Sequence, residues 1–91
     1  METIFVSCGP TLDQCATGKL IAEVDLRTSG ATQTVVVSLA SARDLHWGAL
    51  RRLARAVLCW RAASHGVVIE TSSRPSQRSL LTAAGVLAAT A

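Results

Sequence analysis

The sequence predicts one small α/β domain, in which a parallel or mixed sheet of three or four strands is covered by about three helices. The chain has 91 residues, 49% hydrophobic and 16% charged, which suits a single domain and argues against disorder. Residues 34–39 form a continuous β-branched run that is typical of a strand covered on both faces, and residues 67–70 form a second apolar strand. The amphipathic segment between them, residues 44–63, is long enough for a crossover helix, so the two strands should lie parallel.

The segment before these elements is predicted to hold one strand and one helix. Residues 3–7 form a β-type run that ends at a Gly-Pro turn. Thr11 and Gln14 have the spacing of a capping box, so a helix should begin near Leu12. Gly30 is well placed to end this helix.

The central helix has an amphipathic pattern. At 100° per residue, one arc of it is apolar and contains Leu50, Leu53, Ala54, Val57 and Trp60. The residues that point the other way are Arg51, Arg52, Arg55 and Cys59. Asp44 is a plausible N-cap, because its carboxylate also suits the positive end of the helix dipole. The apolar arc should therefore face the core.

A third helix should follow the loop at residues 71–76. Pro75 suits the first turn of a helix, because an N–H at that position would lack a partner anyway. The helix should stop at Gly85. Helices before and after the central unit are then expected to cover the sheet.

Composition narrows the possible functions. The formal net charge is +3, and several of the nine cations fall on the central helix. A solvated helix face explains them best, and nucleic-acid binding through these arginines stays as an alternative. The segment from residue 80 to residue 91 is too short to span a bilayer, which takes about 20 residues.

The three cysteines, Cys8, Cys15 and Cys59, include no C-x-x-C pair, and no secretory segment opens the sequence. These features predict free thiols in a reducing cytoplasm. His46 and His65 do not have metal-ligand spacing relative to the cysteines, so no metal site is expected.

Catalysis has little support in the sequence. The six acidic residues are scattered, and no glycine-rich phosphate loop or nucleophile–base arrangement can be assembled. We therefore expect no enzyme activity, no catalytic residue and no cofactor.

The third helix carries a recognisable pattern, P-x-x-R-x-L-L-x-x-x-G followed by valine, over residues 75–86. This resembles the closing helix of STAS domains, the family of anti-sigma factor antagonists. Leu50 and Leu53 fall on leucines of that family's central helix, and residues 35–39 fall on one of its strands. Gly9 with residues 12–13 resembles its G-x-L-D turn, spread by one residue. The resemblance spans residues 3–87 and implies a trimmed STAS-like domain that occupies residues 1–91.

The matched region departs from the family pattern in two ways. An additional first strand, a fifth strand and a final helix are missing from the matched region. Such a shortened sheet would expose unpaired strand edges, so a homodimer or an obligate complex is expected. The phosphoserine motif D-S-S-G of the family falls on residues 46–49, where Trp47 replaces the serine. A slipped register that starts at Asp44 again yields no serine, so no phosphoacceptor is expected.

Trp47 has two interpretations. It could cover the core as a lid, or it could be a binding anchor, because tryptophan is enriched at interface hot spots.

The leading hypothesis is a non-catalytic module for transcription regulation. It would bind an anti-sigma factor with the histidine-kinase-like ATPase fold, without phosphorylation control. The expected contact residues are His46, Trp47, Gly48, Leu50 and Arg51. The alternative is a STAS-type accessory subunit of a lipid-transporting ABC complex.

Overall fold

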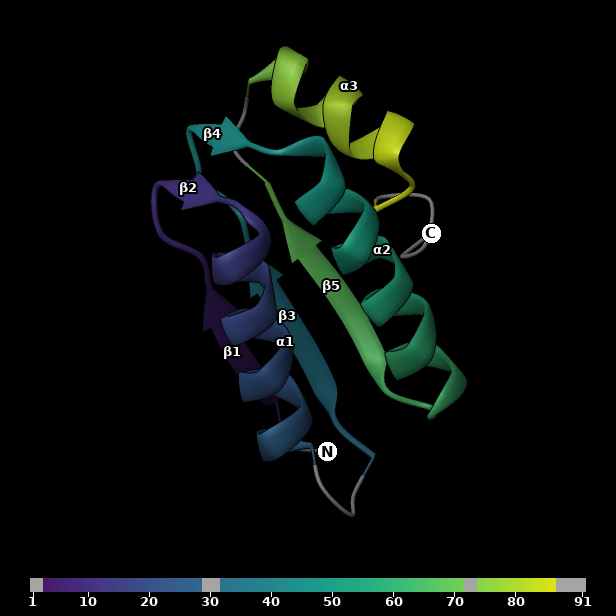
Figure 1. Ribbon diagram of the computed structural model, residues 1–91. Coiled ribbons are helices and arrows are strands. Elements are labelled where there is room, and N and C mark those ends of the chain that lie inside the picture. The colour runs from purple at the N-terminus through teal and green to yellow at the C-terminus, as the bar shows by residue number, and fades with distance from the viewer. Residues whose placement is uncertain (1–2, 29–31, 72–73, 87–91) are drawn as a thin grey trace.

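Three parallel strands form the main sheet of the computed structural model, which describes residues 3–28, 32–71 and 74–86 (Figure 1). They are β1 (Thr3–Ser7), β3 (Thr34–Ser38) and β5 (Gly66–Glu70), in the spatial order β1-β3-β5. The predicted parallel pairing of the two valine-rich runs is therefore confirmed. The predicted fold class, a small α/β domain with three helices, is confirmed as well.

Two helices lie on the same face of this sheet, as Figure 1 shows. They are α1 (Gln14–Arg27) and α2 (Trp47–Ala62), and α3 (Pro75–Ala84) lies beside α2 at one end. Alternate strand residues, such as Val35 and Val37, face the helices and are completely buried. The predicted apolar arc of α2 is confirmed, because all five of its members are buried. The core thus lies between one helix layer and one sheet face.

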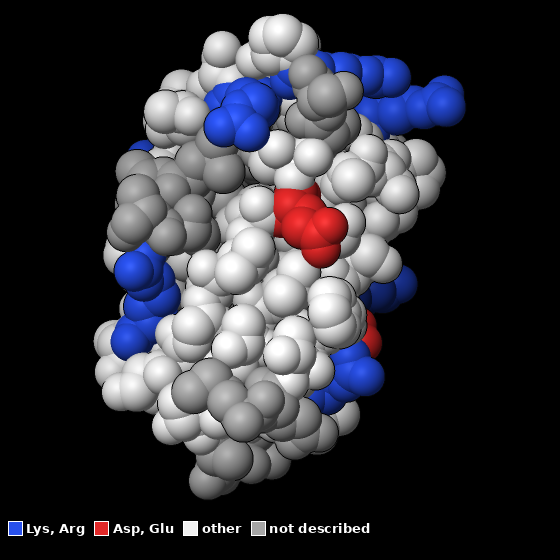
Figure 2. Space-filling view, turned by 180° about the vertical axis from the view of Figure 1, so that it is seen from behind, with Lys and Arg blue, Asp and Glu red and all other residues white. Residues whose placement is uncertain are grey.

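The opposite face of the sheet is the one seen in Figure 2, and few charged side chains lie on it. The register places Phe5, Val36 and Val68 side by side in one row. Phe5 is 66% exposed and Val68 is 48% exposed. The described helices therefore cover only one face of the sheet, whereas the sequence predicted that residues 34–39 are covered on both faces.

Helix α1 begins two residues later than predicted. Thr11 and Leu12 form a short strand, β2 (Thr11–Leu12), which pairs in parallel with β4 (Asp44–Leu45). Asp13 is the N-cap, and its Oδ1 accepts a hydrogen bond from the Ala16 N–H at 2.8 Å. The proposed capping box is therefore wrong, because its first member lies in a strand. The predicted stop, Gly30, lies outside the described residues, and the helix itself ends at Arg27.

The predicted start of α2 is also wrong. Asp44 is a residue of β4 and not the N-cap, because its pairing with Thr11 keeps the chain extended past it. The N-cap is His46, whose side chain makes no capping hydrogen bond. Helix α3 matches its prediction. It begins at Pro75 and stops at Gly85, which has φ of 88° and therefore suits glycine.

Hydrogen bonds from side chains of α2 connect this helix to α1. The Trp60 indole Nε1 donates a hydrogen bond to Asp25 Oδ1 at 2.9 Å, and Trp60 is 4% exposed, as expected of a core residue. Arg52 Nη1 donates to the Gln14 carbonyl at 3.3 Å and passes over Gly18. A Cβ on Gly18 would lie 3.3 Å from that nitrogen, so an alanine there requires only a small shift of the flexible Arg52 side chain.

Candidate functional site

The candidate site lies at the carboxyl edge of the sheet. Because the three strands are parallel, the segments that follow them all leave from this edge, and each of the three helices begins there (Figure 1). The pairing of β2 with β4 holds the starts of α1 and α2 next to each other, and the His46 N–H donates to the Leu12 carbonyl at 3.0 Å. Residues that follow the strands therefore gather at this edge of the molecule.

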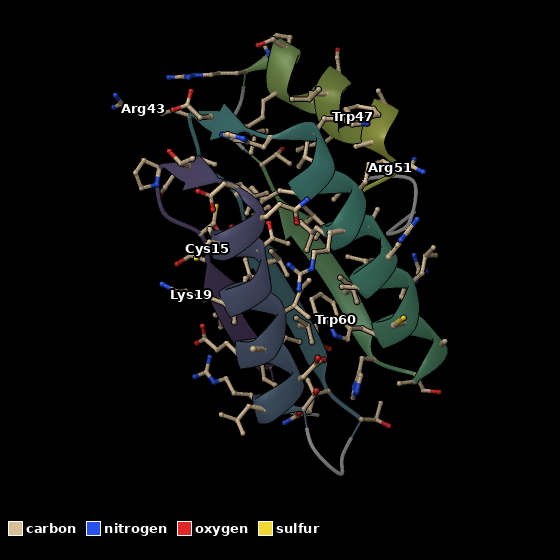
Figure 3. All side chains as sticks on the ribbon, viewed as in Figure 1. Cys15, Lys19, Arg43, Trp47, Arg51 and Trp60 are labelled. Atoms are coloured by element: carbon tan, nitrogen blue, oxygen red, sulfur yellow. The ribbon has the colours of Figure 1, made fainter. Side chains whose placement is uncertain are left out.

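Three of the five expected contact residues present their side chains at the start of α2. His46, Trp47 and Arg51 are exposed. Figure 3 shows Trp47 and Arg51 on the side of α2 that lies away from α1. Leu50 is completely buried, so its side chain packs in the core and is not accessible to a partner.

Gly48 is exposed and lies next to the flexible Gln14 side chain. A Cβ at this position would lie 2.8 Å from Nε2 of Gln14, at the start of α1. Ala49 is completely buried. Ala49 is therefore part of the core, whereas Gly48 itself is exposed at the start of α2.

The exposure of Trp47 bears on its two interpretations. A lid over the core would be largely buried, as Trp60 is at 4% exposed, but Trp47 is 49% exposed. No hydrogen bond joins the Trp47 indole to another described residue. About half of this large side chain is thus available for contact with another molecule.

A shallow pocket opens at the same end of the molecule, between β4 and α3. Its volume is about 170 Å³, and it is lined by Arg43, Leu45, Arg74, Ser76, Gln77 and Leu80. Figure 3 places Arg43 and Trp47 at the same end of the domain but on different sides of it. The sequence analysis missed this pocket, because Arg43 and Arg74 come together only when α3 packs against the chain before β4.

The described residues contain no group of His, Cys, Asp and Glu that could hold a metal ion. All three cysteines are free, with Cys8 buried and Cys15 and Cys59 exposed. Burial raises the pKa of the Cys8 thiol, and a backbone hydrogen bond opposes this effect. Cys59 is exposed, as the helical wheel predicted. Of the helices that the structure describes, none is long and apolar enough to cross a membrane.

Comparison of the chain with protein-family models, with curated proteins and with solved structures gives no match. The resemblance to STAS domains therefore stays a hypothesis based on the sequence pattern.

Proposed function

We propose that this chain is a non-catalytic protein–protein interaction module that binds its partner at the start of α2. The observation that carries the proposal is the 49% exposure of Trp47 in the first turn of that helix. Tryptophan is among the residues most enriched at the energetic centres of interfaces, where it buries a large area. The cationic Arg51 one turn later and the exposed His46 supply a polar rim around it.

By its resemblance to STAS domains, the partner would be an anti-sigma factor with the histidine-kinase-like ATPase fold, in the cytoplasm. In that family a serine at this position is phosphorylated, and the added charge of about −1.5 to −2 releases the partner. Trp47 has no hydroxyl group, so binding here would not be controlled in this way. A lipid-transporting ABC complex is the alternative partner suggested by the same resemblance.

Binding to nucleic acid through the arginines of α2 is less well supported. Arg51 and Arg55 are exposed, but Arg52 is held by the Gln14 carbonyl and lies against α1. The helix face therefore presents few free cations and no aromatic side chain between them. A salt titration tests this alternative, because phosphate contacts would weaken binding by several orders of magnitude between about 50 and 200 mM salt.

The proposal is tested by isolating the partner and measuring its affinity by isothermal titration. Trp47→Ala should weaken binding about 30-fold, which corresponds to about 2 kcal/mol. The matched control is Leu26→Ala, which also truncates an exposed apolar side chain, 78% exposed, near the far end of α1. An unchanged affinity for Trp47→Ala, or an equal loss for Leu26→Ala, would contradict the proposal. Recovery of the partner from the membrane fraction would favour the ABC complex.

A further inference from the structure

Two arginine side chains from distant parts of the sequence share the pocket between β4 and α3. Arg43 precedes β4 and Arg74 precedes α3, and both line the same 170 Å³ hollow. No acidic residue is among the residues that line it. The pocket is therefore a small, cationic cavity, and the proposed Trp47 contact does not use it.

Hydrogen bonds of the Gln77 side chain and of the backbone hold the two sides of this pocket in place. Gln77 is 7% exposed, and its Nε2 donates to the Ala42 carbonyl at 2.8 Å, which ties the first turn of α3 to the segment that carries Arg43. The N–H groups of Arg43 and Asp44 both donate to the Pro10 carbonyl, at 2.7 and 3.1 Å. The backbone on both sides of the pocket is thus held in place before any ligand binds.

The lining groups suit an oxyanion. Guanidinium groups bind phosphate and carboxylate oxygens through paired, charge-assisted hydrogen bonds. Ser76 adds a hydroxyl donor, and Leu45 and Leu80 form apolar walls that strengthen polar contacts made beside them. The first turn of α3 contains no acidic residue and adds a smaller positive potential. The cavity is smaller than the roughly 300–1,000 Å³ of drug-sized sites, so it fits one small group.

We infer that this pocket binds a single oxyanionic group, a phosphate monoester or a carboxylate. The group belongs either to a free small molecule or to a side chain of the bound partner. Only the second source rests on the proposed function, because it requires a partner that contacts Trp47 and also reaches the pocket on another side of the same end of the domain. Binding of a free anion does not depend on any partner.

The first experiment titrates the full, isotope-labelled chain with inorganic phosphate and with O-phosphoserine, and follows the backbone amide signals by NMR. Saturable shifts are expected at residues 43–45 and 74–77. Arg43→Gln and Arg74→Gln should each weaken binding at least about tenfold, because glutamine keeps hydrogen-bonding capacity but loses the charge. The matched control is Arg55→Gln, an exposed arginine of α2 outside the pocket, which should leave the titration unchanged. Sodium chloride at equal ionic strength corrects for screening.

Shifts that do not saturate, or an equal loss of binding in Arg55→Gln, would overturn the inference. Trp47→Ala should leave phosphate binding intact, so failure of the anion site and failure of the partner surface give different results. The second experiment measures partner affinity with and without phosphate. Competition between them shows that the partner supplies the anion, whereas phosphate binding with unchanged partner affinity shows that the anion is a free molecule.

Discussion

Replacing Trp60 by phenylalanine should destabilise the fold by about 2 kcal/mol, whereas the same change at Trp47 should cost under about 0.5 kcal/mol. Trp60 is 4% exposed, and its indole N–H donates to Asp25 Oδ1 at 2.9 Å. Loss of a hydrogen bond to a charged group costs about 1.5–3 kcal/mol, and the exposed Asp25 regains water, which places the cost in the lower part of that range. The smaller ring also leaves a gap in a packed core.

Trp47 differs in each of these respects. It is 49% exposed and makes no hydrogen bond to another described residue, so phenylalanine keeps most of its contacts. Urea unfolding of both variants and of the parent measures the difference in unfolding free energy. Iodide quenching of the single tryptophan left in each variant gives an independent readout, with stronger quenching expected when Trp47 remains. Equal destabilisation by the two changes, or equal quenching, would refute the reasoning.

Four further predictions concern stability and thiol chemistry. Thr17→Val should raise the unfolding free energy by about 1 kcal/mol and the midpoint temperature by about 4–8 °C, because the buried Thr17 Oγ1 has no hydrogen-bond partner among the described residues; calorimetry that shows no gain would contradict this. Gly85→Ala should lower the stability by about 1 kcal/mol or more, since φ of 88° strains a side chain, and an unchanged urea midpoint would argue against it. Cys8 should react with a thiol reagent far more slowly than Cys15 and Cys59. Burial raises the pKa of Cys8 above its ordinary value of 9.0, so the unfolded chain loses the thiol proton at a lower pH than the folded chain. The unfolding free energy should therefore fall as the pH rises above 9.0. Cys8→Ala should remove this pH dependence.

The regular elements could be predicted from the sequence because they follow periodicity. The apolar arc of α2 was correct at every position, since a spacing of 3.6 residues decides which side chains meet the core. The stop at Gly85 was correct because only a residue that tolerates positive φ suits that position. The starts of α1 and α2 were wrong, because the pairing of Thr11 with Asp44 joins residues far apart in the chain.

The functional surface was predictable only in part. The position of Trp47 at the helix entrance could be read from the sequence, but its exposure could not, since a tryptophan in that turn suits a core as well as an interface. The pocket at Arg43 and Arg74 depends on how α3 packs, through its buried Leu81 and Ala84 and through the bond from Gln77 to the Ala42 carbonyl. No local pattern contains that information.

Oxidative footprinting of the two tryptophans, with and without the bound partner, tests the central claim most directly. In the free chain, hydroxyl radicals should modify Trp47, which is 49% exposed, and spare Trp60, which is 4% exposed. The partner should protect Trp47 and leave the modification of Trp60 unchanged. Equal modification of Trp47 in the free and bound chains would place the contact elsewhere on the molecule.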